Sequence, residues 1–257
     1  MHIRFIGYGR LAKSIITTWA KHHQITISSP RLSQGLIASH IQTTSDNTAL
    51  LDTADIIVLA VKPKMIASVL KEIQPFLNPN TVIISLAAGL TLDRLKTLCP
   101  SHSKIIRAMP NIAAEVGRST TLLLCPSSLQ AIVEPLFLEI GAIHWVEQDD
   151  LLDIGTILAG SGPAYVFYLM RALQDIGITL GMPESLCKSL VQETFLGASV
   201  LSLEKTDSLH DLQQQVTSPQ GTTAAAIHVL ETQHVHESLK QAVLAAWQRI
   251  QELRNEN

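Results

Sequence analysis

The first half of the chain alternates between short apolar runs, rich in β-branched residues, and stretches with helical periodicity. The expected strands cover residues 3–7, 24–29, 41–44, 55–61, 81–87, 103–108, 119–125 and 143–147. Several of these runs are continuously apolar, as in strands that are buried on both faces of a sheet. Helical patterns lie between most of them, as at 10–22 and 63–76. This alternation predicts a parallel, doubly wound α/β sheet.

Beyond the last expected strand only helical periodicity remains, which predicts an all-α second half. The expected helices cover residues 150–180, 184–204, 208–216, 220–231 and 234–254. We therefore expect an α/β domain at 1–148 and an all-helical domain at 149–257. Apolar positions such as Ile154, Leu158 and Leu173 exceed what a small bundle can hide, so a second subunit is expected to cover part of this surface.

A glycine turn, Gly7-Tyr8-Gly9-Arg10-Leu11-Ala12, directly follows the first expected strand. The pattern G-x-G-x-x-A between a strand and a helix is typical of Rossmann-type dinucleotide-binding domains. Gly7 permits the tight turn, Gly9 lets the backbone approach a pyrophosphate, and Ala12 allows the helix to pack closely on the strand. The amides at the helix N-terminus then serve the phosphates. The residues expected to bind the pyrophosphate are Gly7, Gly9, Arg10, Leu11 and Ala12.

The end of the second expected strand bears on the choice of cofactor. An NAD site usually has an acidic residue there, which binds the ribose 2′-hydroxyl. This chain has Ser28, Ser29 and Arg31 instead, and two hydroxyls with an arginine suit a 2′-phosphate better. The expected cofactor is therefore NADPH, with NADH as the alternative.

Later strands of a parallel sheet end at the same edge, so the segments that follow them should face the same cofactor. Small residues in these segments leave room for a ligand, and the amide of Asn111 suits the amide of a nicotinamide or a bound water. The additional residues expected at the cofactor are Ala60, Val61, Lys62, Pro63, Ala88 and Asn111.

Two segments of the second half are unusual for helices. Gly160-Ser161-Gly162-Pro163 interrupts an apolar helical stretch at a cost in helix stability, which is often tolerated where backbone approaches a ligand. Ser218-Pro219-Gln220-Gly221-Thr222-Thr223 leads into an Ala-rich helix and exposes both amides and hydroxyls. Such a helix entry can bind a carboxylate.

Composition and charge narrow the class of protein. Of the 257 residues, 46% are hydrophobic and 16% are charged, and the net charge is −3, so a sizeable core is expected and nucleic acid is not an expected partner. The three cysteines lie far apart and show neither metal-ligand nor disulfide spacing. The chain begins with a strand-like run, and its apolar runs are too short to span a bilayer. We expect a cytoplasmic protein that has no membrane partner.

Taken together, these segments resemble the pyrroline-5-carboxylate reductase family over essentially the whole chain. The matching segments are the glycine turn Gly7–Ala12, Ala60-Val61-Lys62-Pro63, Arg107-Ala108-Met109-Pro110-Asn111, Gly160-Ser161-Gly162-Pro163-Ala164-Tyr165 and the Ser218–Thr223 segment. The last two are specific to this family among Rossmann reductases. It implies a Rossmann domain followed by an all-α dimerisation domain. It also implies NAD(P)H-dependent reduction of a cyclic imine carboxylate, 1-pyrroline-5-carboxylate, to L-proline in a homodimer or a larger ring of dimers.

The same resemblance implies roles for single residues. Lys62, Pro63 and Asn111 would lie near the ribose and nicotinamide of the cofactor. Thr223 would stand at the imine nitrogen as the catalytic hydroxyl. The residues implied to bind the substrate are Ser218, Gly221, Thr222 and Thr223.

The chain departs from the family pattern at a few positions. Gln220 stands where the family usually has the first of two glycines, and Arg171 stands where an acidic residue usually precedes the alanine of the long helix. A further acidic residue has two competing counterparts, Glu204 and Asp207. These departures favour, as an alternative, a catalytically weak NADP-binding paralogue with a regulatory role.

Reductases of a related cyclic imine or of a β-hydroxyacid are further alternatives. A β-hydroxyacid dehydrogenase would have a catalytic lysine on the first helix after the cofactor domain. Here no lysine follows Pro163 before Lys188.

The residues at the end of the second strand predict cofactor preference. With Ser28, Ser29 and Arg31 in place of an acidic residue, kcat/KM should be higher with NADPH than with NADH. Steady-state kinetics with both cofactors measures this ratio. A clear preference for NADH would contradict the interpretation.

Overall fold

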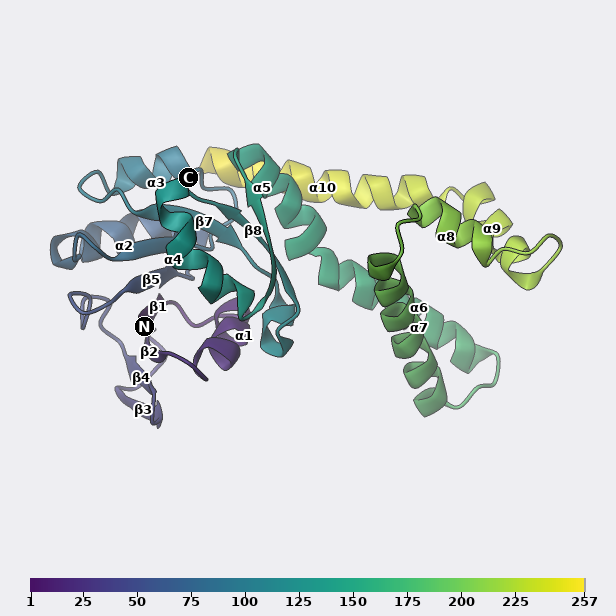
Figure 1. The fold of residues 1–257 in the computed structure, drawn as a ribbon, viewed down its shortest axis with the longest axis horizontal. Helices are drawn as coiled ribbons and strands as arrows, with labels where there is room; N and C mark the ends of the chain where they lie inside the picture. Colours follow the sequence, from purple (N-terminus) through teal and green to yellow (C-terminus); the bar gives the residue numbers. More distant parts are fainter. Residues whose placement is uncertain (257) are drawn as a thin grey trace. The chain divides into compact units, whose positions relative to one another are not determined.

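The computed structural model describes residues 1–256, which form an α/β part and a part made only of helices (Figure 1). The chain divides into two compact units. The first unit contains Met1–Pro163 and the residues from Ala245 onward, and the second contains Ala164–Leu244.

A nine-stranded sheet, in the order β3-β4-β2-β1-β5-β6-β7-β8-β9, forms the centre of the first unit. Strands β1, β2, β4, β5, β6 and β7 run parallel, whereas β3 is antiparallel to β4 and β8 is antiparallel to β7. The strands are β1 (His2–Ile6), β2 (Gln24–Ser28), β3 (Gly35–Ala38), β4 (Ile41–Thr44), β5 (Ile56–Leu59), β6 (Val82–Ser85), β7 (Ile105–Met109), β8 (Ser119–Leu124) and β9 (Gly141–Val146).

The sheet is therefore mixed, and the prediction of a parallel sheet was wrong at its two ends. Between β7 and β8 the chain forms only the short 3₁₀ segment η3 (Ile112–Val116), which cannot make the long crossover that a parallel neighbour needs. Strand β3 was not predicted. It is four residues long and pairs with β4 across a tight turn at Ser39 and His40, so hairpin geometry rather than an apolar pattern produces it.

Alternating side chains of the strands form two cores, one on each face of the sheet. Phe5 lies in the core that contains Trp19 of helix α1, and Ile57 lies in the core that contains Leu70 of helix α2. The crossovers after β1 and β5 thus place their helices on opposite faces. The helices and 3₁₀ segments of this part are α1 (Arg10–Trp19), η1 (Pro63–Met65), α2 (Ile66–Ile73), η2 (Gln74–Phe76), α3 (Leu92–Leu98), η3 and α4 (Ser127–Leu138).

Up to residue 256, the regular elements that follow β9 are all helices, as predicted. The expected helix 150–180 is interrupted, because a π-helical segment lies between α5 and α6. The elements are α5 (Asp149–Gly155), η4 (Thr156–Gly160), α6 (Gly162–Thr179), α7 (Glu184–Glu204), α8 (Leu209–Gln215), α9 (Thr222–Thr232) and α10 (Val235–Glu256). None of the helices within residues 1–256 combines the length and apolar character that a membrane crossing requires.

The second unit has almost no core of its own. Cys187 is its only buried residue. Large apolar side chains remain exposed along its helices, among them Phe167 at 58% and Leu203 at 85% of their accessible area. An apolar surface of this extent is typical of subunit interfaces.

A buried cluster of charged side chains holds the end of α10 within the first unit. The carboxylate of Asp153, which is fully buried, accepts hydrogen bonds from Arg107 Nη2 at 2.8 Å and from Arg254 Nε at 2.6 Å. Asp149 also pairs with Arg107, and its Oδ1 accepts the N–H of Leu92 at 3.0 Å. The cluster therefore joins β7, α3, α5 and α10.

Removing the buried carboxylate should destabilise the protein strongly. Asp153→Asn leaves two guanidinium groups without their shared anion, and breaking a buried ion pair costs about 3 kcal/mol or more. Asp150→Asn is the matched control, because Asp150 binds the same Arg254 but its side chain is 65% exposed. Its loss should cost at most about 1 kcal/mol. Urea unfolding measures both changes, and equal effects would contradict the central role of Asp153.

Candidate functional site

The predicted cofactor residues of the first unit gather at the carboxyl ends of the parallel strands. They follow β1, β2, β5, β6 and β7, which all run in the same direction. Because the crossovers after β1 and β5 leave on opposite faces of the sheet, the loops there form the crevice in which doubly wound sheets bind ligands.

Gly7 and Gly9 shape the turn between β1 and α1. Gly7 has a φ of +104°, and a Cβ on it would lie 2.5 Å from Ala60 O, so no other residue fits without a shift of backbone. Gly9 is the N-cap of α1, and a Cβ on it would meet no atom within 4 Å. No side chain caps this helix. Its first N–H groups therefore face open space, as an anion site requires.

The end of β2 is linked to a residue that the sequence reasoning missed. Ser28 is buried, and its hydroxyl donates to Asn47 Oδ1 at 2.8 Å. Asn47 Nδ2 donates in turn to Glu72 Oε2 at 2.9 Å. Ser29 is half-buried and Arg31 is exposed. Asn47 comes just after the expected strand 41–44, so its place at the carboxyl end of a parallel strand was a signal that could have identified it.

The remaining predicted cofactor residues differ in exposure. Lys62 is exposed and has extended backbone, as the following Pro63 requires, while Ala88 is half-buried. Asn111 is only 7% exposed, and both ends of its amide already have protein partners. Its Nδ2 donates to Ala159 O at 3.0 Å, and its Oδ1 accepts the N–H of Ala113 at 2.9 Å.

The predicted substrate residues all lie in the second unit, at the start of α9. Gly221 is the N-cap of this helix, and no side chain caps it. A Cβ on Gly221 would lie 2.4 Å from Ser218 Oγ and 3.1 Å from Ser218 O, so a side chain here would require Ser218 to move. Thr222 is exposed and Thr223 is half-buried. The uncapped amides and two hydroxyls together have the chemistry to bind an anion, as the start of α1 does.

Gln220, one of the departures from the family pattern, has a left-handed backbone conformation with a φ of +59°. A residue with a Cβ pays about 1 kcal/mol or more for this conformation, whereas glycine does not. The tertiary structure thus shows why a glycine would be favoured there. Arg171 is exposed on α6, and its guanidinium lies 5.6 Å from the centre of the Tyr168 ring.

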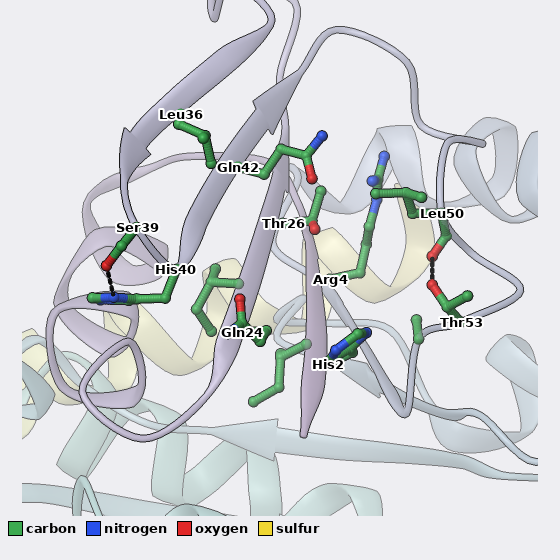
Figure 2. A pocket seen from close by; sticks show the side chains of 13 residues that line it. His2, Arg4, Gln24, Thr26, Leu36, Ser39, His40, Gln42, Leu50 and Thr53 are labelled. Atoms are coloured by element: carbon green, nitrogen blue, oxygen red, sulfur yellow. Dashed lines mark hydrogen bonds between the residues drawn. The ribbon is translucent and has the colours of Figure 1, made fainter.

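A separate hollow lies along strands β1, β2 and β4 (Figure 2). It has a volume of about 330 Å³, and its lining includes Arg4, Thr26 and Gln42 from three neighbouring strands. Burial lowers the pKa of the Arg4 guanidinium to about 10, and Nη2 donates to Asp46 O at 2.5 Å. The hollow contains no predicted site residue.

No group of three or more His, Cys, Asp or Glu side chains within residues 1–256 is placed to hold a metal ion. The three cysteines are free thiols. Burial raises the pKa of the Cys125 thiol to about 11, so this sulfur is a poor nucleophile near neutral pH.

Comparison with known proteins gives consistent matches to both halves. A family model described as pyrroline-5-carboxylate reductase dimerisation matches residues 149–253, and one described as NADP oxidoreductase coenzyme F420-dependent matches residues 2–89. The pyrroline-5-carboxylate reductase of Pasteurella multocida is 34% identical, over 98% of this chain and 97% of its own length. That of Haemophilus influenzae is 32% identical over the same shares of the two chains.

Solved structures are similar over the same length. The crystal structure of Plasmodium falciparum pyrroline carboxylate reductase with NADP bound has a TM-score of 0.90 and 28% identity, covering 99% of this chain and 98% of that one. The pyrroline-5-carboxylate reductase structure from Coxiella burnetii has a TM-score of 0.83 and 33% identity, covering 98% and 97%.

The two glycines of the first turn should respond differently to the same substitution. Gly7→Ala combines an unfavourable φ with a contact to Ala60 O, and should lower the free energy of unfolding by about 2 kcal/mol or more. Gly9→Ala should change it by less than about 0.5 kcal/mol, because its Cβ enters open space. The added methyl should instead weaken dinucleotide binding about tenfold or more, because it occupies the approach to the pyrophosphate. Chemical unfolding and cofactor titration test the pair, and unchanged affinity in Gly9→Ala would contradict this site.

Proposed function

Because the chain belongs to the pyrroline-5-carboxylate reductase family, we propose that it reduces 1-pyrroline-5-carboxylate to L-proline with NADPH. The observation that carries this proposal is similarity across both halves, with curated relatives up to 34% identical over 98% of the chain. The geometry supports it, because each half contributes a helix that begins at a glycine N-cap without a side-chain cap. One suits a pyrophosphate and the other a substrate carboxylate.

The first unit fits the cofactor. The open space beside Gly9 and the uncapped start of α1 suit a pyrophosphate, and Ser28, Ser29 and Arg31 suit a 2′-phosphate. Bound NADPH supplies the hydride from its nicotinamide ring. The NADP that is named in the Plasmodium falciparum structure supports this choice. The residues proposed to form the cofactor-binding site, by contact with the cofactor or by supporting the backbone around it, are Gly7, Gly9, Arg10, Leu11, Ala12, Ser28, Ser29, Arg31, Ala60, Val61, Lys62, Pro63, Ala88 and Asn111.

The start of α9 would hold the substrate. The amides that follow Gly221 and the hydroxyls of Ser218 and Thr222 can neutralise a carboxylate without a buried arginine. The Thr223 hydroxyl would hydrogen-bond the ring nitrogen and relay a proton between that nitrogen and water, so that the imine accepts the hydride in its protonated form. A protonated imine is already electrophilic, so the site needs no strong general acid.

The second unit would form the subunit interface of a homodimer. A unit in which Cys187 alone is buried is not stable in water by itself, and a second copy would cover its exposed apolar helices. We propose that the boundary between the two functional domains lies between residues 148 and 149, where both helix α5 and the match to the dimerisation family begin. A larger ring of dimers and a cytoplasmic location complete the proposal.

The direct test is to incubate the protein with NADPH and 1-pyrroline-5-carboxylate. NADPH oxidation is monitored by absorbance, and the product proline is detected separately. Tight binding of NADPH without turnover would contradict the reductase proposal. It would favour instead a catalytically weak paralogue, for which the strained Gln220 is the supporting observation.

The hydroxyl of Thr223 can be tested within the same helix. Thr223→Ala should lower kcat about 100-fold, as expected when a group that positions or transfers a proton is lost, and leave the Kd of NADPH nearly unchanged. Thr232→Ala is the matched control, because it removes a hydroxyl of α9 that donates within its own helix, to His228 O and Val229 O. Wild-type activity in Thr223→Ala would remove Thr223 from the mechanism.

A further inference from the structure

The junction between α5 and α6 is irregular for a physical reason. In the π-helical segment η4 (Thr156–Gly160) the N–H of Ser161 donates to Thr156 O at 2.8 Å, five residues back instead of four. Pro163 has no N–H, so it cannot make the usual α-helical hydrogen bond to Ala159 O. Single π-helical turns are costly and occur often at functional sites.

Asn111 supplies the donor that Pro163 cannot. Its Nδ2 donates to Ala159 O at 3.0 Å from the segment that follows β7. The other contacts of Asn111 fix its own position, because Oδ1 accepts from Ala113 N and the backbone N–H donates to Ser119 Oγ, both at 2.9 Å. At 7% exposure this is a buried and nearly complete set of hydrogen bonds.

The hydrogen bond from Asn111 Nδ2 to Ala159 O holds the irregular backbone against the carboxyl end of β7. A Cβ on Gly160 would lie 3.4 Å from Met109 Cγ, so backbone and strand end are in close contact there. A Cβ on Gly162 would meet nothing within 4 Å, so the next turn faces open space. Strands β5 to β7 lie on one side of the cofactor crevice, and the Ala159–Gly162 backbone borders that side.

We infer that Asn111 is a positioning residue for hydride transfer: through Ala159 O it fixes the Ala159–Gly162 backbone as a wall at the nicotinamide end of the crevice. This inference rests on the proposed reductase function. Asn111 then acts on the reaction without having to touch the cofactor. A residue that only satisfied a buried carbonyl would affect stability but not the rate of the chemical step.

Asn78 offers a matched control for this distinction. Its Nδ2 donates to Asp52 O at 3.2 Å and its Oδ1 accepts the N–H of Asn80 at 2.9 Å, which is the pattern of Asn111. It precedes β6, however, and therefore lies at the amino ends of the strands, away from the crevice. Asn78→Ala should lower the Tm but change kcat by less than twofold.

Asn111→Ala should lower kcat at least tenfold, because small displacements of groups that orient reactants have large effects on rate. The Kd of NADPH should change less than threefold. Adding Pro163→Ala gives Ala159 O a helical N–H donor again and should restore the Tm without restoring kcat, because it allows the segment to straighten. If Asn111→Ala folds poorly, Asn111→Asp keeps the acceptor for the N–H of Ala113 and replaces the donor to Ala159 O with a carboxylate oxygen that repels it, so the same loss of kcat is expected.

The possible outcomes distinguish a failure of the positioning role from a failure of the proposed function. An unchanged kcat in Asn111→Ala, or recovery of kcat together with Tm in the double variant, would overturn the positioning role while leaving the reductase function intact. No imine reduction by the unmodified protein would contradict the proposed function instead. In that case amide hydrogen exchange at residues 160–166 still tests whether Asn111 holds the segment. Exchange should be faster in Asn111→Ala than in Asn78→Ala. Equal exchange rates in the two variants would show that the hydrogen bond from Asn111 to Ala159 O does not hold it.

Discussion

The first unit depends on a carboxylate that is buried between two guanidinium groups. Asp153 has no exposed surface, and Arg107 and Arg254 both donate to it from segments far apart in the chain. A buried carboxylate without partners would be unstable, so the position of α5 is tied to the presence of both arginines. Because Arg107 lies on β7 and Arg254 near the end of α10, this contact brings the last turns of the chain to the α/β sheet.

The same part of the sheet governs the candidate site. Arg107 and Met109 lie in β7, and Asn111 follows directly after its end. The ion pair of Arg107 with Asp153 and the hydrogen bond of Asn111 to Ala159 therefore hold the segment formed by α5 and η4 at two points. The irregular turn around Gly160 is thus supported from β7 on both sides of Met109. A rigid support of this kind is what orientation of a nicotinamide requires, since hydride transfer depends on the placement of the reacting atoms.

Two helices of this chain begin with the same arrangement, which suits an anion. At α1 and at α9 a glycine is the N-cap, no side chain caps the helix, and the first amides stay available. A helix N-terminus offers a partial positive charge without a charged side chain. An anion can therefore be bound there without burying an arginine or lysine, whose desolvation is unfavourable. The two sites lie in different units, which is consistent with one serving the cofactor and the other the substrate.

The sequence by itself determined the elements whose signals are local. The turn at Gly7 and Gly9, the carboxyl-edge residues after β5 and β6, and the helix entry at Gly221 could be predicted, because each depends on backbone conformation or on a short periodic pattern. The reversed direction of the predicted strands β8 and β9, the hairpin strand β3 and the π-helical turn at Thr156–Gly160 were decided only by the tertiary structure. So were the partners of Asn47, Asn111 and Asp153, because each bond joins residues that periodicity cannot relate. Hydrogen bonds of this kind form only once packing has brought distant segments within about 3 Å of one another.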